Sequence, residues 1–191
     1  MKAIAICGSP RKDGNTQILL AHCLARLEKD GIDVELITLR DKTIKPCIAC
    51  GMCGQRKDGT CSIKDDNFQE VFDAMKEADI IVVGSPVYFG SATPQTMALL
   101  DRAGYVSRSS GNLLSRKIGG PVTVARRAGQ NFTYAQLMYW FMINDMIVPG
   151  SSYWNIAFGR AAGEVENDEE ALSTIDRFAE NLSWLARKLF D

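Results

Sequence analysis

The sequence predicts an α/β fold built on an open, doubly wound parallel sheet of five strands. Two short segments, Ala3 to Cys7 and Ile80 to Val83, are apolar almost without interruption, as is typical of strands buried on both faces. Segments with apolar residues at helical spacing alternate with the expected strands along the chain. Because parallel strands are joined by crossover helices that cover the sheet, this alternation favours the doubly wound arrangement.

Size and charge narrow the class of protein. The chain has 191 residues, so residues 1–191 are expected to form a single domain with a substantial core. A formal net charge of −1 provides no basic field for nucleic acid, and no segment is apolar for long enough to span a membrane. The first apolar run stops at a Gly-Ser-Pro loop instead of continuing as a signal peptide would. We therefore expect a cytoplasmic protein with reduced cysteines.

The first half of the chain predicts two strands and two helices. The strand Ala3 to Cys7 is followed by a loop and by a helix from about Thr16 to Lys29. Val34 to Leu39 has the character of a second strand, after which the cysteine-rich loop begins. A capping box formed by Asp66 with Gln69 is expected to open a second helix, which ends near Asp79.

The third and fourth strands follow a similar plan. The strand Ile80 to Val83 leads into a loop and then a helix, for which Thr93 is the expected cap and Pro94 the first residue. That helix is expected to run to about Arg102. A polar connection from Ser107 to Gly120 then leads to a strand at Pro121 to Ala125.

The last part of the chain predicts an interrupted strand between two helices. A helix is expected from about Phe132 to Met146, and its segment Tyr134 to Ile143 is apolar nearly all round. Such a helix is either buried against another subunit or fully covered within the core. Ile147 and Val148, then Tyr153 to Phe158, form the interrupted strand, and an amphipathic helix closes the chain.

Two loops at the ends of strands have the composition of a mononucleotide site. Gly8 to Thr16 offers hydroxyls, backbone N–H groups and a helix N-terminus, which together suit one phosphate. The loop lacks the glycine pattern of dinucleotide sites and the Walker pattern of ATP sites. The alternative to a phosphate site is a polar turn that caps the following helix. In the second loop, Gly84 to Gly90, the side chains of Tyr88 and Phe89 suit either contact with a flat ring or ordinary packing. In a third loop, after the strand Pro121 to Ala125, Arg126 and Arg127 suit negative charge on a bound cofactor or a nicotinamide phosphate, or simple exposure to solvent.

Four of the six cysteines lie in the loop from Pro46 to Cys61. Their spacing, Cys-x2-Cys-x2-Cys-x7-Cys, places three thiolates on one tight turn and suits a cubane iron-sulfur cluster with four cysteine ligands. A loop that merely retains the thiols, a zinc site and disulfides are the alternatives. Cys7 and Cys23 lie on expected core faces, and the single histidine, His22, is expected to have a surface or packing role.

The two loops, Gly8-Ser9-Pro10-Arg11 with Gly14-Asn15-Thr16 and Gly84-Ser85-Pro86-Val87-Tyr88-Phe89-Gly90, resemble those of the flavodoxin-like NADPH-dependent FMN reductase superfamily. The cysteine motif after the second strand resembles that of the iron-sulfur flavoproteins within it. The resemblance implies that FMN binds at Ser9, Arg11, Asn15, Thr16, Ser85, Pro86, Val87, Tyr88, Phe89, Gly90, Arg126 and Gly129. It implies that a [4Fe-4S] cluster is held by Cys47, Cys50, Cys53 and Cys61.

The function expected from this resemblance is electron transfer through FMN and the cluster, with no catalytic acid, base or nucleophile. Ferredoxin or NAD(P)H is the expected donor, and a quinone, an oxygen species or another protein the acceptor. The resemblance also implies a homo-oligomer, a dimer or tetramer, in which the cluster of one subunit approaches the FMN of another. The alternatives are a cluster-free NAD(P)H-dependent FMN or quinone reductase and, in a different class, a zinc-stabilised binding module without enzymatic activity.

Overall fold

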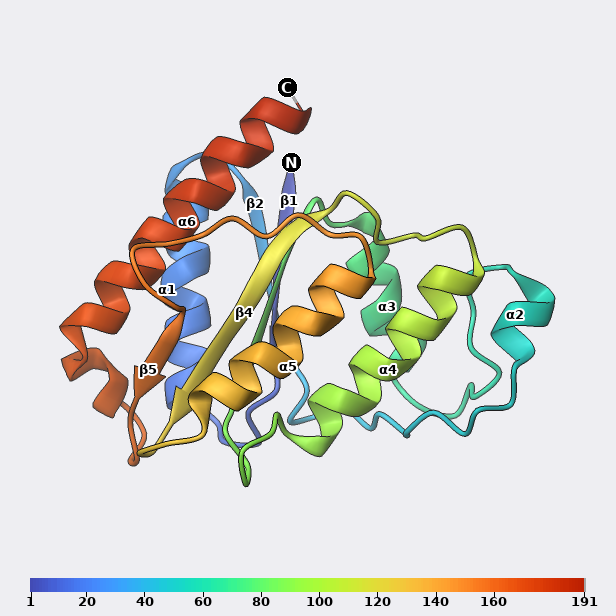
Figure 1. Cartoon of the computed structure of the whole chain (residues 1–191), viewed down its shortest axis with the longest axis horizontal. Helices are drawn as coiled ribbons and strands as arrows, with labels where there is room; N and C mark the ends of the chain where they lie inside the picture. The colour runs from blue at the N-terminus through green and yellow to red at the C-terminus, as the bar shows by residue number, and fades with distance from the viewer. Residues whose placement is uncertain (191) are drawn as a thin grey trace.

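The computed structural model describes residues 1–190 and confirms the doubly wound α/β fold (Figure 1). Five strands form one sheet in the order β2-β1-β3-β4-β5, and every neighbouring pair is parallel. The strands are β1 (Lys2–Cys7), β2 (Asp33–Thr38), β3 (Ile80–Pro86), β4 (Ile118–Ala125) and β5 (Ile156–Phe158). The helices are α1 (Asn15–Lys29), α2 (Met52–Arg56), α3 (Phe68–Glu77), α4 (Pro94–Ser109), α5 (Gln130–Ile143) and α6 (Glu169–Phe190), with a 3₁₀ turn, η1, at Glu164–Asn167.

The sheet separates two apolar cores. α1 and α6 cover one face, whereas α3, α4 and α5 cover the other (Figure 1). Successive residues of a strand point to opposite faces, so Ile4 and Ile6 enter the second core while Ala3, Ala5 and Cys7 enter the first. This two-sided burial explains why the central strands are apolar without alternation.

Several predicted boundaries are wrong because tertiary contacts extend the elements. α4 continues beyond Arg102 to Ser109, and β4 begins at Ile118 instead of Pro121, so the predicted polar connection is much shorter. Ser107 lies inside α4, where its buried hydroxyl accepts a hydrogen bond from the N–H of Leu114 at 3.1 Å. The final strand is only β5, since Ile147 makes no more than an isolated parallel bridge to Ile118.

The predicted capping box is also wrong. Asn67, not Asp66, immediately precedes α3, and the Asn67 side chain does not cap the helix. The Asp66 carboxylate accepts from the N–H of Phe68, the first residue of α3, at 3.2 Å and is also paired with Arg102. The amide of Gln69 does not complete the box, because it bonds Gly59 and Cys61 in the cysteine loop. By contrast, Thr93 does cap α4, where its hydroxyl accepts from the N–H of Thr96 at 3.4 Å.

Several apolar side chains of α5 are not covered by the rest of the chain. Its buried residues are Thr133, Leu137, Trp140 and Phe141, whereas Tyr139 and Met142 are 74% and 64% exposed. The alternative of a fully covered core helix is therefore wrong for the single chain. None of the helices described in residues 1–190 combines the length and the apolar character that crossing a membrane requires.

We predict that Gly119→Ala destabilises the fold by about 3 kcal/mol, because a Cβ at this position would lie 1.9 Å from the carbonyl oxygen of Ile81 on β3. Urea unfolding followed by circular dichroism measures the change. Gly150→Ala is the matched control, since nothing lies within 4 Å of the added methyl group. Equal free energies of unfolding for the two variants would contradict the close packing of Gly119 on β4 against the backbone of β3.

Candidate functional site

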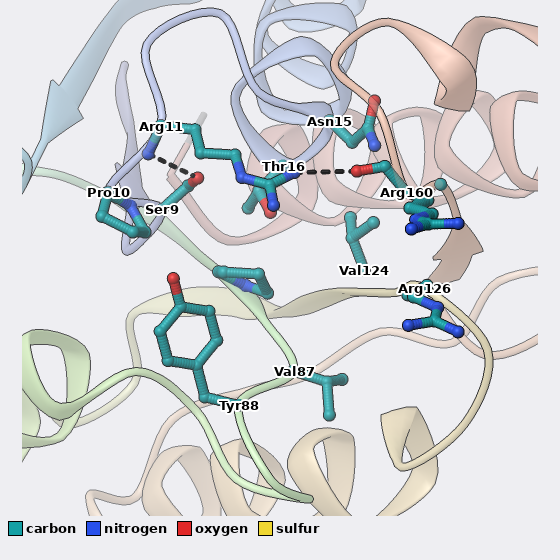
Figure 2. A pocket seen from close by; sticks show the side chains of 12 residues that line it. Ser9, Pro10, Arg11, Asn15, Thr16, Val87, Tyr88, Val124, Arg126 and Arg160 are labelled. Atoms are coloured by element: carbon teal, nitrogen blue, oxygen red, sulfur yellow. Dashed lines mark hydrogen bonds between the residues drawn. The ribbon is translucent and has the colours of Figure 1, made fainter.

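A cavity of about 260 Å³ opens at the carboxyl ends of β1, β3 and β4 (Figure 2). The strand order reverses between β1 and β3, which is where ligands bind in doubly wound sheets. Three arginines and no acidic residue line the cavity, so it favours an anionic ligand. Its lining residues are Ser9, Pro10, Arg11, Asn15, Thr16, Pro86, Val87, Tyr88, Val124, Arg126, Gly159 and Arg160.

The loop after β1 presents an open helix N-terminus to this cavity. The Ser9 hydroxyl accepts from the N–H of Arg11 at 3.2 Å, which closes a short turn before α1. Gly14 precedes α1 without any side-chain cap, and no acidic residue lies in the first turn of the helix. The N–H groups and positive dipole end of α1 therefore remain available to a phosphate. Arg11 donates to the carbonyl of Arg160 at 2.8 Å (Figure 2).

The Asn15 side chain joins α1 to the segment after β5. Its amide donates to the carbonyl of Ala161 at 2.8 Å and accepts from the N–H of Val165 at 3.3 Å. A Cβ at Gly159 would lie 2.4 Å from the same amide, so the packing is close on both sides. The predicted contact between Asn15 and a ligand must therefore use its backbone N–H.

The loop after β3 ends in a tight hairpin. Tyr88 and Ser91 exchange backbone hydrogen bonds of 2.8 and 3.0 Å across Phe89 and Gly90, whose φ angles are +52° and +81°. Positive φ at both central residues is the geometry of a type I′ turn. Tyr88 faces the cavity, but Phe89 is fully exposed at the tip, and neither central residue lines the cavity.

Two further predicted residues support the loop walls and do not line the cavity. The buried Ser85 hydroxyl accepts from the N–H of Thr93 at 3.0 Å, which fixes the end of β3 against the start of α4. Gly129 has a φ of +89°, and a Cβ there would lie 3.0 Å from Val87. The loop after β4 thus packs against the hairpin while Arg126 reaches the cavity.

Four lining residues are not among the predicted ones: Pro10, Val124, Gly159 and Arg160. Gly159 and Arg160 directly follow β5. The rule that ligands bind beyond the carboxyl ends of parallel strands points to both, once the fifth strand is known to end at Phe158. Arg127 is exposed and is not part of the cavity wall.

A second cavity, of about 280 Å³, is lined by all four cysteines of the cysteine-rich loop. α4 forms its opposite wall, and the two cavities share no lining residue. Within the loop, α2 is a single turn between Gly51 and Lys57, which both have left-handed backbone conformation. The lining residues are Cys47, Ile48, Ala49, Cys50, Gly51, Cys53, Cys61, Ser62, Ile63, Arg102, Tyr105 and Val106.

Three of these sulfurs have polar neighbours that stabilise thiolates. The N–H of Ala49 donates to Cys47 at 3.5 Å, and the hydroxyl of Ser109 donates to Cys53 at 3.9 Å. The Ser62 hydroxyl lies 3.1 Å from Cys50, and this contact is the main cause of a pKa below the usual thiol value there. Hydrogen bonds to ligand sulfurs orient them and tune a bound metal centre.

The cysteine arrangement does not suit a single metal ion. Within residues 1–190, no three cysteine, histidine or acidic side chains come close enough to hold one ion. All six cysteines are free thiols, which excludes disulfides in this structure. Cys7 and Cys23 are buried as predicted, and burial raises the pKa of Cys23 to about 12. Four thiols around one wide cavity instead fit a polynuclear cluster.

Comparison with known proteins shows the family to which the chain belongs. Residues 1–161 match the model of the family described as NADPH-dependent FMN reductase. The chain is 41% identical to an iron-sulfur flavoprotein of Methanocaldococcus jannaschii over 91% of both chains. It is 31% identical to an iron-sulfur flavoprotein of Methanosarcina thermophila, over 95% of this chain and 93% of the other.

Solved structures with low sequence identity share the fold. A structure of RosB with a bound flavin-type intermediate has a TM-score of 0.78 at 20% identity, covering 99% of this chain and 80% of that one. A flavodoxin, WrbA-like protein of Agrobacterium tumefaciens has a TM-score of 0.68 at 17% identity, covering 98% of both chains. These similarities confirm the flavodoxin-like architecture.

We predict that Asn15→Ala lowers the free energy of unfolding by about 2 kcal/mol, because it leaves a buried N–H and a carbonyl without partners. Gln17→Ala on the same helix is the control, since the Gln17 side chain bonds only the exposed Asp13. Its effect should stay within about 0.5 kcal/mol in the same urea titration. A small loss for Asn15→Ala would mean that the segment after β5 is held by other contacts.

Proposed function

This chain belongs to the NADPH-dependent FMN reductase family as an iron-sulfur flavoprotein, and from that premise we propose that it transfers electrons between a reduced donor and an acceptor through FMN and a [4Fe-4S] cluster. The observation that carries the proposal is the pair of separate cavities, one lined by arginines and a helix N-terminus, the other by four cysteines. Bound FMN exchanges electrons in pairs or singly, and an iron-sulfur cluster carries them singly.

The residues of the first cavity suit a flavin mononucleotide. The α1 N-terminus, the Ser9 turn and Thr16 would hold the phosphate, with Arg11 at the cavity wall. Pro86 to Tyr88 would lie along the ring system, and the backbone of this segment would bond its polar edge. Arg126 and Arg160 would stabilise negative charge on the reduced flavin.

The residues of the second cavity suit a cluster with four cysteine ligands. Cys47, Cys50, Cys53 and Cys61 all line the cavity, and its remaining wall is mostly apolar. A zinc-stabilised binding module is less well supported, because no three ligands converge on a single ion within the described part of the chain. A cluster-free NAD(P)H-dependent FMN or quinone reductase is the remaining alternative.

The proposed donor is ferredoxin or NAD(P)H in the cytoplasm, and the proposed acceptor is a quinone, an oxygen species or another protein. We propose a homo-oligomer, a dimer or tetramer, in which the cluster of one subunit approaches the FMN of another. The exposed apolar side chains of α5, Phe132, Tyr139, Met142 and Ile143, support this assembly because they leave a large apolar surface uncovered.

Protein purified without oxygen is expected to contain FMN together with iron and sulfide in equal amounts, and to show broad iron-sulfur absorption beside the flavin bands. Cys50→Ser should lose most of the iron and sulfide while keeping FMN, because it removes a thiolate from the second cavity only. Cys23→Ala is the control, since Cys23 is buried far from the loop in the core between α1 and the sheet, and should keep all three components. Flavin without iron in the unaltered protein would instead favour the cluster-free reductase, and a colourless zinc protein the binding module.

Thr16→Val is expected to weaken FMN binding about tenfold, which is about 1.4 kcal/mol, because it removes a buried hydroxyl from the cavity and keeps the shape of the side chain. Quenching of FMN fluorescence on binding to apoprotein measures the dissociation constant. Gln17→Ala should bind FMN as the unaltered protein does, since Gln17 does not line the cavity. An unchanged dissociation constant for Thr16→Val would indicate that the phosphate does not bind at the N-terminus of α1.

Stopped-flow reduction distinguishes the donors. Reduced ferredoxin is expected to reduce both cofactors faster than NADPH does, because the cluster accepts single electrons. Rapid and complete flavin reduction by NADPH alone would count against the ferredoxin-dependent role and favour the reductase alternative.

A further inference from the structure

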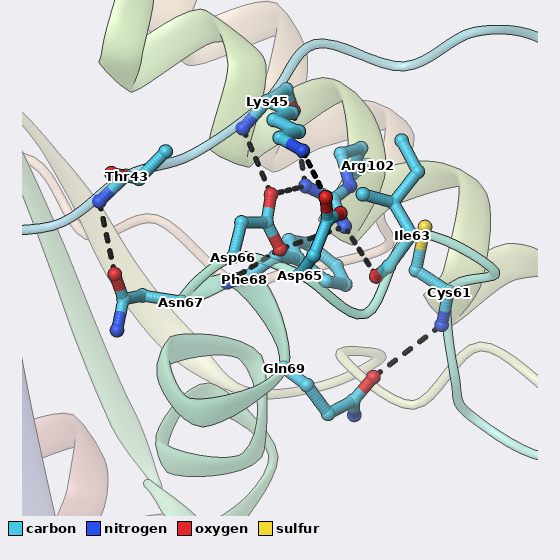
Figure 3. Close-up of polar contacts among 10 residues, drawn as sticks. All are labelled: Thr43, Lys45, Cys61, Ile63, Asp65, Asp66, Asn67, Phe68, Gln69 and Arg102. Atoms are coloured by element: carbon cyan, nitrogen blue, oxygen red, sulfur yellow. Dashed lines mark hydrogen bonds and ion pairs between the residues drawn. The ribbon is translucent and has the colours of Figure 1, made fainter.

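Arg102 is a buried cation in the wall of the cysteine cavity. It lies on α4 and is only 1% exposed, although arginine is seldom buried unless it is paired. Its guanidinium forms an ion pair with the equally buried Asp66 and lies 4.0 Å above the ring of Phe68 (Figure 3). The two terminal nitrogens also donate to the carbonyls of Lys45 and Ile63, at 3.0 and 3.2 Å.

One donor of this guanidinium has no partner. The Nε atom of Arg102 is buried and makes no hydrogen bond within residues 1–190, whereas both terminal nitrogens are fully engaged. A buried N–H without an acceptor costs free energy, so such a group calls for an explanation. The cavity that Arg102 lines with the four cysteines is the place where an acceptor would lie.

Cys61 is the candidate acceptor. Figure 3 shows its backbone N–H directed toward Gln69 and its sulfur on the other side, toward Ile63 and Arg102. Among the four cysteines, Cys61 is the one whose sulfur has no neutral hydroxyl or backbone donor in the described chain.

We propose that Arg102 is a positioning residue for the iron-sulfur cluster: its Nε–H holds the sulfur of Cys61, and its charge favours the reduced form of the cluster. This inference rests on the proposed function. Arg102 lines the cavity and Asp66 does not, so the positive end of the ion pair is the nearer one. Reduction adds negative charge to the cluster, and the nearer positive end, which is itself buried, stabilises that charge.

The test measures the reduced and oxidised cluster by electron paramagnetic resonance in anaerobically purified protein, poised at the midpoint potential of the unaltered cluster. In Arg102→Gln, the ratio of reduced to oxidised cluster is expected to fall about tenfold, which corresponds to about 59 mV for a one-electron couple. Arg102→Lys keeps the charge and should show a smaller fall. The midpoint potential of FMN bound in the same samples should not change, so it provides an internal reference.

Asp66→Asn is the matched control, because it breaks the same ion pair but leaves the cation beside the cysteines. It should raise the reduced fraction, whereas general loosening of the network would shift both variants in the same direction. Since removing one member of a buried pair is strongly destabilising, Arg102→Met with Asp66→Leu supplies a folded, uncharged pair. That double variant should also lower the reduced fraction of the cluster. If the sulfur of Cys61 is no longer held in place, the double variant should instead lose iron while it keeps FMN and a normal unfolding midpoint.

An unchanged ratio in both Arg102→Gln and the double variant, with full iron content, would overturn the inference and leave the proposed function standing. A shift of Asp66→Asn in the same direction as Arg102→Gln would also overturn it. Absence of iron and sulfide from the unaltered protein would reject the proposed cluster and this inference together.

Discussion

The constraint on which the structure depends is the reversal of winding between β1 and β3. Chain connections lead away from these neighbouring strands in opposite directions, so the loops that follow them separate and leave a cavity at the edge of the sheet. The same reversal places α1 on one face and α4 on the other. The open N-terminus of α1 and the hairpin after β3 therefore meet across the cavity because of the topology, without any special motif.

The cysteine-rich loop lies outside this arrangement and needs its own support. It contains only one helical turn and contributes few side chains to the core, so its position depends on polar contacts with α3 and α4. The buried pair between Asp66 and Arg102 ties the end of the loop to α4, and Gln69 ties Cys61 and Gly59 to α3. A buried ion pair contributes little net stability, but this one fixes geometry, since both charged groups also bond the backbone of the loop at Lys45 and Arg102 reaches Ile63 as well.

The parts of the fold that local chemistry controls could be predicted from the sequence. Apolar strands, the cap at Thr93 and the cysteine spacing depend on neighbours in the chain, and the structure agrees with each of them. The capping box failed because Gln69 bonds the cysteine loop, and because Asp66 also pairs with Arg102, which lies 36 residues further along the chain. Arg160 was missed for a similar reason, because only the short strand β5 shows that the following residues reach the cavity. Such pairings arise from tertiary structure and leave no periodic pattern in the sequence.

α4 runs from the loop after β1, beside the first cavity, to the wall of the cysteine cavity. At its start, the Thr93 hydroxyl donates to the carbonyl of Gly8 at 2.8 Å, and a Cβ at Gly8 would lie 1.8 Å from the hydroxyl of Thr96. Only glycine at that position lets α4 pack so closely on the loop after β1. About two helical turns later, a rise of about 12 Å from Pro94, the same helix presents Arg102 to the cysteines. Because a helix of this length is stiff and both contacts are buried, the separation of the two cavities within one chain is set by α4. The distance between the two cavities therefore depends on a rigid element, while Ile48 and Tyr105 in the wall of the cysteine cavity are exposed.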